Sequence, residues 1–392
     1  MKKILVLNGT ISEIPIIKKA QEMGLYVVTT GNMPGLPGHQ FADEYISADY
    51  SDGKAILKIV KEQEIDGIVS CANDFGAITA SYVSDIMGWK GHDSYENTVL
   101  MHNKDIFRQY FIKMGFPVPE SAIFTDCTEA ESYCKTCKYP VIVKPNDLTG
   151  GKGVRKAYDY KDAVMALKNA FSMSRKKIIL VEEFLDGIQQ SIVVFLVNRK
   201  IVVTSCSNIY CMRNPYLVQA ETYPATNFDL VEKQLDNIIL TMAEDLKLAD
   251  GVFSFQYFVK DGKPIVIDMM RRCFGNETFL LADMRTGFPF EEAYIRASLG
   301  MDCTNLKWDK QTYKYCGHYG VMADRNGILD SWSLPDDIEG RVFKKTVNME
   351  SGTVIHNYLT EKIAHIYFHY DDLKTMNREI VKYNERVNVN IK

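Results

Sequence analysis

Strand and helix signals alternate through the first hundred residues of the chain. Short apolar runs, typical of buried strands, are separated by segments with helical signals. The apolar runs are residues 4–7, 25–28 and 65–71, and the helical segments are residues 14–23, 54–63 and 75–87. Such alternation predicts an open parallel sheet covered by helices.

The signals change after the first hundred residues. Residues 190–197 are mostly apolar and β-branched, and residues 201–205 are their expected hairpin partner. Two further strand runs flank Asp261-Gly262, a hairpin turn signal. The segment 208–226 is expected to be irregular. Helices are expected at residues 105–114, 129–137, 160–171 and 231–247, and the strand-rich tail after residue 313 has one near 371–384.

The chain has 392 residues, a formal net charge of −4 and a pI of about 6.0. This charge argues against a nucleic acid or an anionic membrane as the main partner. The N-terminus MKKILVLNGT has only four successive apolar residues, fewer than the ~7–15 of a secretory signal. No run approaches the ~20 apolar residues of a membrane helix. We therefore expect a cytoplasmic protein.

Nine cysteines, an odd number, are spread along the chain. In a reducing compartment they are expected to be free thiols. Cys134 and Cys137 form an isolated Cys-x-x-Cys pair, without the second pair or the nearby histidine that a structural zinc site needs. We expect these two cysteines to lie on one face of a helix rather than to bind a metal.

A glycine-rich loop follows an apolar strand in the stretch VIVKPNDLTGGKGV, residues 141–154. Lys144 ends the apolar run, and residues 150–153 are Gly-Gly-Lys-Gly. The loop is not a Walker A motif, because Lys152 is followed by glycine and not by Ser or Thr. It is not a dinucleotide fingerprint either, because the third glycine would fall at Lys156. Asn8-Gly9-Thr10 stands where the first phosphate turn of a dinucleotide fold would be, but no G-x-G-x-x-G is present there, so NAD or FAD is not expected.

Four segments carry groups that together suit ATP and magnesium. Lys104 opens a helix, Lys144 ends a strand, Glu182 follows a buried strand, and Gln256 and Asp268 lie on two adjacent strands. Two lysines and a loop of backbone N–H groups can neutralise phosphates, and carboxylate and amide oxygens suit magnesium. Taken singly, each segment has an ordinary structural explanation: a solvated lysine, a turn or a polar strand end.

In order and spacing, these segments resemble the ATP-grasp family across essentially the whole chain. The matching motifs are Asn103-Lys104, Gly115-Phe-Pro-Val-Pro119, Tyr139-Pro-Val-Ile-Val-Lys144-Pro145, Gly150-Gly-Lys-Gly153, Val181-Glu-Glu-Phe-Leu-Asp-Gly187, Val252-Phe-Ser-Phe-Gln256, Val266-Ile-Asp268-Met-Met-Arg-Arg272, Thr286-Gly-Phe-Pro-Phe290 and Ala297-Ser-Leu-Gly300. The resemblance implies a multidomain α/β and α+β fold. Its parts are an N-terminal open parallel α/β domain at residues 1–100, an ATP-grasp domain of two α+β subdomains at 101–305 with a small lid at about 115–185, and a small strand-rich module at 306–392.

The resemblance also implies a nucleotide site. Lys104 and Lys144 would contact the α- and β-phosphates, and the glycine loop would close over the β- and γ-phosphates. Glu182 and the backbone of Leu185 would bind the adenine edge. The whole set that the resemblance implies is Lys104, Lys144, Gly150, Gly151, Lys152, Gly153, Glu182, Glu183, Phe184, Leu185 and Gln189.

The metal site and the catalytic residues follow from the same resemblance. Gln256 and Asp268 would hold Mg²⁺, with Mn²⁺ as an alternative. Lys144 and Arg272 would be catalytic. Arg272 would hold the transferred phosphate and the acyl intermediate.

Three positions depart from the family pattern. Many members carry glutamate at the positions of Gln189 and Gln256. Met270 stands where the common pattern has asparagine, and a thioether is a poor ligand for magnesium. The number of ions, one or two, therefore stays open unless Asn276 or Glu277 supplies an oxygen.

The implied chemistry is the ATP-dependent joining of a carboxylate to an amine through an acyl phosphate. The carboxylate is expected to be an amino acid or another small carboxylate, with Arg213, Asn276 and Arg285 as candidate substrate residues. The alternatives are a bicarbonate-using enzyme akin to biotin carboxylase or carbamoyl-phosphate synthase, a non-catalytic ATP-binding protein and a Rossmann-type oxidoreductase. The expected partners are small molecules, without nucleic acid or membrane, and dimerisation is common in the family.

Overall fold

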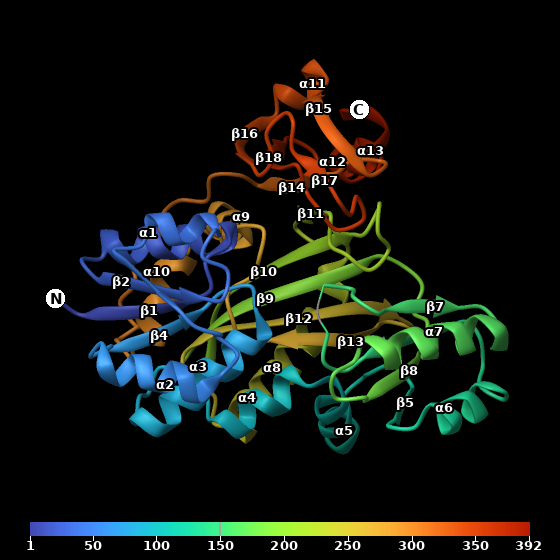
Figure 1. Cartoon of the computed structure of the whole chain (residues 1–392), viewed down its shortest axis with the longest axis horizontal. Helices are drawn as coiled ribbons and strands as arrows, with labels where there is room; N and C mark the ends of the chain where they lie inside the picture. Colours follow the sequence, from blue (N-terminus) through green and yellow to red (C-terminus); the bar gives the residue numbers. More distant parts are fainter. Residues whose placement is uncertain (149) are drawn as a thin grey trace.

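The computed structural model describes residues 1–148 and 150–392. Thr149, within the predicted glycine loop, lies outside the described residues. Figure 1 shows three groups of elements, with the N-terminal part in blue, the central part in green and yellow, and the C-terminal part in red. Among the helices of the described residues, none has both the length and the apolar content needed to cross a membrane.

A four-stranded parallel sheet forms the N-terminal part, as the alternating signals predict. Its strands, in the order β3-β2-β1-β4, are β1 (Lys3–Leu7), β2 (Tyr26–Gly31), β3 (Glu44–Ser47) and β4 (Gly67–Ser70). The helices are α1 (Ile14–Glu22), α2 (Gly53–Glu62), α3 (Asp74–Met87) and α4 (Tyr95–His102). The sequence did not indicate β3, because this edge strand has no buried apolar run. It did not indicate α4, which buries a mixed set of side chains.

A second, antiparallel sheet forms a small subdomain beside the central sheet (Figure 1). Its strands, in the order β5-β8-β6-β7, are β5 (Ser121–Phe124), β6 (Val141–Pro145), β7 (Arg155–Ala157) and β8 (Ile179–Glu183). Nearby helices are α5 (Lys104–Met114), α6 (Cys127–Cys134) and α7 (Tyr160–Met173). Because α6 ends at Cys134, Cys137 lies in the turn beyond it, and the prediction of a shared helix face is wrong. All nine cysteines lie within the described residues and are free thiols.

A large antiparallel sheet crosses the centre of the molecule. Its strands, in the order β13-β12-β9-β10-β11-β14-β18-β16, are β9 (Gln189–Val197), β10 (Lys200–Tyr210), β11 (Ala220–Tyr223), β12 (Gly251–Lys260), β13 (Lys263–Met270), β14 (Tyr315–Val321), β16 (Val342–Val347) and β18 (Ala364–Tyr370). Helix α8 (Glu232–Asp245) shares a hydrophobic core with Phe253 and Phe255 of β12. Because strand side chains alternate, Ser254 and Gln256 point to the opposite face of this sheet.

The segment 208–226 is more regular than its sequence suggested. Strand β10 continues to Tyr210 and β11 covers Ala220–Tyr223, so the irregular parts are residues 211–219 and 224–226. The polar residues of both strands explain the error, because Asn208 and Thr222 bond to each other inside the sheet instead of facing water.

The C-terminal part extends the central sheet, because β14, β18 and β16 pair onward from β11. A separate three-stranded sheet covers it, with β15 (Gly327–Ser333), β17 (Val354–Ile355) and β19 (Asn388–Ile391). The remaining helices are α9 (Thr278–Thr286), α10 (Phe290–Ser298), α11 (Asp336–Glu339), α12 (Leu373–Ile380) and α13 (Tyr383–Arg386). The single helix predicted near 371–384 is therefore two short helices.

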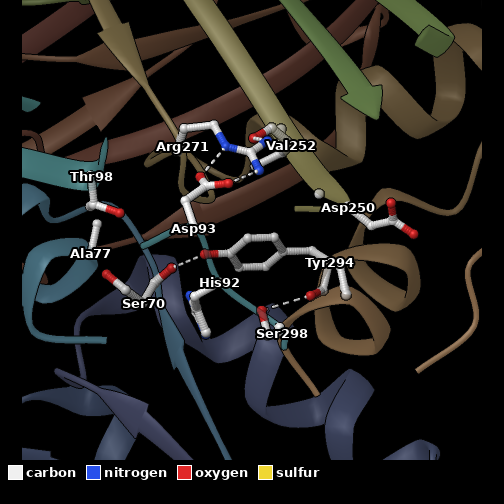
Figure 2. Close-up of a pocket in the computed structure, with 13 residues that line it drawn as sticks. Ser70, Ala77, His92, Asp93, Thr98, Asp250, Val252, Arg271, Tyr294 and Ser298 are labelled. Atoms are coloured by element: carbon white, nitrogen blue, oxygen red, sulfur yellow. Dashed lines mark hydrogen bonds and ion pairs between the residues drawn. The ribbon is translucent and has the colours of Figure 1, made fainter. Parts of the chain in front are cut away.

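A buried ion pair ties the N-terminal part to the central sheet (Figure 2). Arg271 follows β13, and its Nε and Nη2 donate to Asp93 at 2.6 and 3.0 Å. The same guanidinium donates to the carbonyl oxygens of Val252 and Ala249. Asp93, Val252 and Arg271 border a cavity of about 20 Å³, the size of a single water. The contacts give Arg271 a structural part, distinct from that of its neighbour Arg272.

Candidate active site

A cavity of about 490 Å³ lies between the central sheet and the small subdomain of β5 to β8. Its volume falls within the ~300–1,000 Å³ typical of ligand pockets. One face of the central sheet lines it, through Gln189, Ser191 and Val193 on β9 and Ser254, Gln256 and Phe258 on β12. The alternation of strand side chains therefore places polar groups from both strands on one surface.

Lys144, at the end of β6, is held at the cavity wall by a buried carboxylate. Its Nζ lies 2.6 Å from Oε2 of Glu182 on β8, and Nε of Arg108 lies 2.8 Å from Oε1. Burial raises the pKa of Glu182, but Arg108 and Lys144 together lower it to about 2. Glu182 therefore stays charged and fixes Lys144. Because both its oxygens contact cations, its contact with adenine remains a prediction.

The predicted metal ligands lie side by side. Gln256 and Asp268 are directly opposite each other in the ladder between β12 and β13, and both line the cavity. Oδ2 of Asp268 is 3.3 Å from Nζ of Lys104, and Oε1 of Gln256 accepts a hydrogen bond of 3.0 Å from Gln189. The structure thus brings Lys104, Gln189 and both ligand candidates together.

This donor set fits magnesium. The ion takes oxygen ligands, and it is usually held by one or two carboxylates together with substrate phosphates. Among the described residues, no group of three or more His, Cys, Asp or Glu side chains could hold a metal ion. An ion at Asp268 and Gln256 would therefore share its remaining positions with phosphate oxygens and water.

Of the three residues considered for a second ion, two line the cavity and the third contacts other residues. Met270 and Asn276 line the cavity. Glu277 instead contacts Lys344, and it accepts a hydrogen bond of 2.9 Å from Thr346. Of the two candidates, Asn276 is therefore the one that could supply an oxygen to a second ion. Its Oδ1 already accepts a hydrogen bond from Lys362.

The glycine loop contacts the segment that follows β10. Gly150 and Gly151 line the cavity, with φ of +64° and +72°. A Cβ on Gly151 would lie 2.4 Å from the carbonyl oxygen of Tyr216, so this close approach requires glycine. The Tyr216 hydroxyl also accepts a 2.6 Å bond from the backbone N–H of Lys156. The structure does not place Lys152 and Gly153 among the lining residues.

Arg272 lines the cavity and is bound to the N-terminal part. Its Nε lies 2.6 Å from Oδ1 of Asp74, at the start of α3, and His102 contacts the same oxygen at 3.1 Å. Burial raises the pKa of Asp74, but Arg272 and His102 lower it well below its ordinary value. The sequence did not indicate Asp74, because a first-turn aspartate is common at helix starts.

Apolar side chains form one wall of the cavity. Ile142, Phe184, Leu185, Phe258 and Ile267 line it. Nζ of Lys156 lies 3.3 Å from the ring centroid of Phe184. Glu183 also lines the cavity, and Lys260 holds it at 2.5 Å. An aromatic and aliphatic wall beside the buried lysine suits a flat base.

The β11 side of the cavity contains groups that the sequence did not single out. Glu221, on β11, and Lys362, before β18, both line it. Neither belongs to a motif, and each comes from an ordinary mixed stretch of sequence. Arg213 and Arg285 are not among the lining residues, and their part in substrate binding remains a prediction.

Sequence comparison matches residues 102–210 to the model "Phosphoribosylglycinamide synthetase, ATP-grasp (A) domain". The N-terminal section of the carbamoyl phosphate synthase large chain of Methanopyrus kandleri is 24% identical over 298 residues. That match covers 72% of this chain and 52% of the relative, so the chain spans about half of its length. Phosphoribosylamine–glycine ligase of Clostridium acetobutylicum is 36% identical over 95 residues, which cover 23% of this chain and 22% of that protein.

Solved structures share the whole fold. L-amino acid ligase from Bacillus licheniformis superposes with a TM-score of 0.84 at 16% identity, covering 100% of this chain and 99% of that one. Phosphoribosylglycinamide synthetase from Anaerococcus prevotii gives 0.76 at 18% identity, with both chains covered completely. At these identities the likeness is one of fold, and the described cavity carries any argument about substrates.

Proposed function

We propose that this chain, which belongs to the ATP-grasp superfamily, is an ATP-dependent ligase that joins a carboxylate to an amine through an acyl phosphate. One observation carries the proposal. A single cavity is lined by Lys104 and Lys144, by the pair Gln256 and Asp268, and by Arg272. Cations for phosphates, oxygen ligands for magnesium and an arginine for a transferred phosphate are the groups that this reaction needs.

In the first step, an oxygen of the substrate carboxylate attacks the γ-phosphorus of ATP. The new P–O bond forms as the bond to ADP breaks, and Lys144 and Arg272 bind the charge on the phosphate oxygens. A magnesium ion bound at Asp268 and Gln256 would supply further neutralisation of that charge. Asp74 keeps Arg272 oriented through the 2.6 Å ion pair.

In the second step, the amine nitrogen attacks the carbonyl carbon of the acyl phosphate. The C–N bond forms, and the C–O bond breaks with its electrons leaving on inorganic phosphate. Water must be kept away from the acyl phosphate meanwhile. The glycine loop, packed against Tyr216, is the part of the chain that we assign to this exclusion.

The direct test is phosphate release from ATP and magnesium with amino acids and small carboxylates, added singly and in pairs. We expect release that needs a particular pair, with a product mass equal to condensation. Release that needs bicarbonate would instead favour the carbamoyl-phosphate synthase or biotin carboxylase type of reaction, which curated relatives and solved neighbours carry in their names. Tight ATP binding without release from any mixture would favour a non-catalytic protein.

ATP affinity should depend on pH through Lys144. Burial lowers the pKa of this lysine to about 8, and the attraction of Glu182 offsets only part of the effect. Since phosphates bind the charged form, the Kd for ATP should be constant below pH 8 and rise by up to about tenfold per pH unit above it. Calorimetric titrations between pH 6.5 and 9.5 would measure this.

Lys144→Arg provides the control for that titration, because arginine stays charged throughout the range. The rise should disappear in this variant. An unchanged rise would assign the titration to another group, and Lys362 is the alternative, because burial also lowers its pKa to about 8.

A further inference from the structure

A row of polar side chains crosses the central sheet beside the cavity, and Asp268, Gln256, Ser191 and Glu221 of this row line it. In the strand register, Asp268 is opposite Gln256, Gln256 is opposite Ser191, and Ser191 is opposite Ser207. The hydroxyls of Ser191 and Ser207 lie 2.7 Å apart, and Ser207 donates to Oε1 of Glu221 at 3.1 Å. The row therefore links the proposed metal site on β13 to a carboxylate on β11.

The row is long enough for two substrates. Four strand spacings separate β13 from β11, and at ~4.8 Å each they amount to about 19 Å. In the proposed reaction, a transferred phosphate beside Asp268 and a donor carboxylate beside Arg272 would occupy the first part of that distance. The part beside Glu221 is left for the second substrate.

Glu221 is a buried carboxylate that no lysine or arginine of the described residues contacts within 4 Å. Its Oε2 lies 3.9 Å from Nε2 of His318, which is beyond hydrogen-bonding distance. Burial lowers the pKa of His318 to about 3, so this ring is neutral and brings no positive charge. Both ring nitrogens of His318 are buried without a hydrogen-bond partner among the described residues. The carboxylate therefore lacks a positively charged hydrogen-bond donor among the described residues, and it faces the cavity.

Lys362 is the complementary group across this part of the cavity. Its Nζ donates to the carbonyl oxygen of Val218 at 2.8 Å and to Oδ1 of Asn276 at 3.2 Å. An ammonium group has three N–H donors, so one remains for a ligand. Glu221 attracts this ammonium, but no ion pair within 4 Å joins the two in the described structure.

We propose that Glu221 and Lys362 form the acceptor subsite of the ligase, and that the acceptor is an α-amino acid. The ammonium group of the acceptor binds Glu221, and its carboxylate binds Lys362. A zwitterion places one charge of each sign a short distance apart, and it supplies each buried residue with the counter-charge that it lacks. This assignment rests on the proposed ligase function.

Glu221 also gives the acceptor a route to its reactive form. An ammonium nitrogen has no free electron pair, so one proton must leave before it attacks. Burial raises the pKa of Glu221 to about 7, which suits a carboxylate that takes this proton near neutral pH. The neutral amine then forms the C–N bond, the C–O bond to phosphate breaks, and the second nitrogen proton leaves with the phosphate as hydrogen phosphate.

The charges argue against an acceptor that carries a phosphate group, such as the amine named for the Clostridium relative. A phosphate group at this position carries two negative charges. Lys362 would offset only one of them, and the Glu221 carboxylate lies nearby. The buried carboxylate of Glu221 repels such a ligand, whereas it attracts the ammonium group of an amino acid.

The test separates the two half-reactions in the full-length protein. Hydroxylamine, ATP, magnesium and a pool of small carboxylates report acyl-phosphate formation as hydroxamate, without any amino-acid acceptor. The twenty amino acids are then offered as acceptors, and each active one is compared with its methyl ester. We expect wild type to prefer the free amino acid by about 10- to 100-fold in kcat/KM, because the ester loses a charged hydrogen bond.

Two variants test the assigned contacts. Lys362→Met should abolish the preference for the free acid over the ester. Glu221→Gln should lower the ratio of amino-acid product to hydroxamate by about 100-fold, because it removes both the ammonium contact and the proton acceptor. Glu339→Gln and Lys345→Met change an ion pair outside the cavity lining and should leave both assays unchanged.

Hydroxamate formation without use of any amino acid would overturn the acceptor assignment while keeping the ligase function. A Lys362→Met protein that keeps the wild-type preference would also overturn it. If no hydroxamate forms at all, the ligase function fails, and thermal shifts with the same amino acids decide on the subsite alone. A shift in wild type that both variants lose supports the subsite, and no shift in wild type rejects it.

Discussion

An Asp268→Asn protein should release phosphate from ATP about 10³-fold more slowly than wild type, which corresponds to about 4 kcal/mol of lost transition-state stabilisation. Asparagine keeps the shape of the side chain and one oxygen, but it removes the negative charge that faces the proposed ion. Gln256, directly opposite on β12, has a neutral amide and cannot replace that charge. The measurement is kcat/KM for ATP at saturating magnesium with the active substrate pair.

Asp261→Asn is the matched control, because Asp261 is exposed in the turn between β12 and β13. It should remain within about twofold of wild type, as expected for an exposed site away from the chemistry. Activity of Asp268→Asn within fivefold of wild type would remove this residue from the metal site. ATP binding measured without magnesium should change little in either variant, because the two lysines proposed to bind the phosphates, Lys104 and Lys144, remain.

The second large effect concerns stability. Asp93→Asn should lower the free energy of unfolding by about 3–5 kcal/mol, because it leaves the buried guanidinium of Arg271 without its counter-charge. Asp93 accepts both guanidinium bonds and also a 2.8 Å bond from the backbone N–H of Ala249. Urea unfolding followed by tryptophan fluorescence and circular dichroism would measure the loss.

Glu292→Gln serves as the comparison for that measurement. Glu292 pairs with Arg296 one turn along α10 at 2.7 Å, and about a third of each side chain is exposed. Such a surface pair contributes at most about 1 kcal/mol. If Asp93→Asn is no more destabilising than Glu292→Gln, the ion pair is not what holds the N-terminal part against the central sheet.

Local signals were sufficient to predict the parts of the fold that repeat a simple period. The strands β1, β2 and β4 are buried apolar runs, and helices followed where the period changed. The edge strand β3 was missed because half-buried positions carry no such pattern. Strand β11 was missed because its polar residues bond across the sheet, and that pairing depends on register.

The residues of the candidate site also divide into those that the sequence indicated and those that it did not. Lys144, Gln256 and Asp268 were identified because Lys144 ends a predicted strand, the other two lie on strands that flank a hairpin signal, and their order resembles that of a known family. The structure places all three around one cavity. Glu221 and Lys362 were not, because 140 intervening positions separate them and neither has a local signature. The pairing of β11 with β14, and of β14 with β18, brings their segments together.

The continuity of the central sheet has a consequence for how such enzymes diversify. The groups proposed to bind the nucleotide and its metal ion lie on β6, β8, β12 and β13. Lys362 and His318 come from the last eighty residues, through strands that join at the edge of β11. Exchange of that final stretch between relatives would replace half of the proposed acceptor subsite in one event. If the pairing of β11 with β14 is kept, such an exchange would leave the proposed ATP site unchanged. The specificity for the acceptor would change.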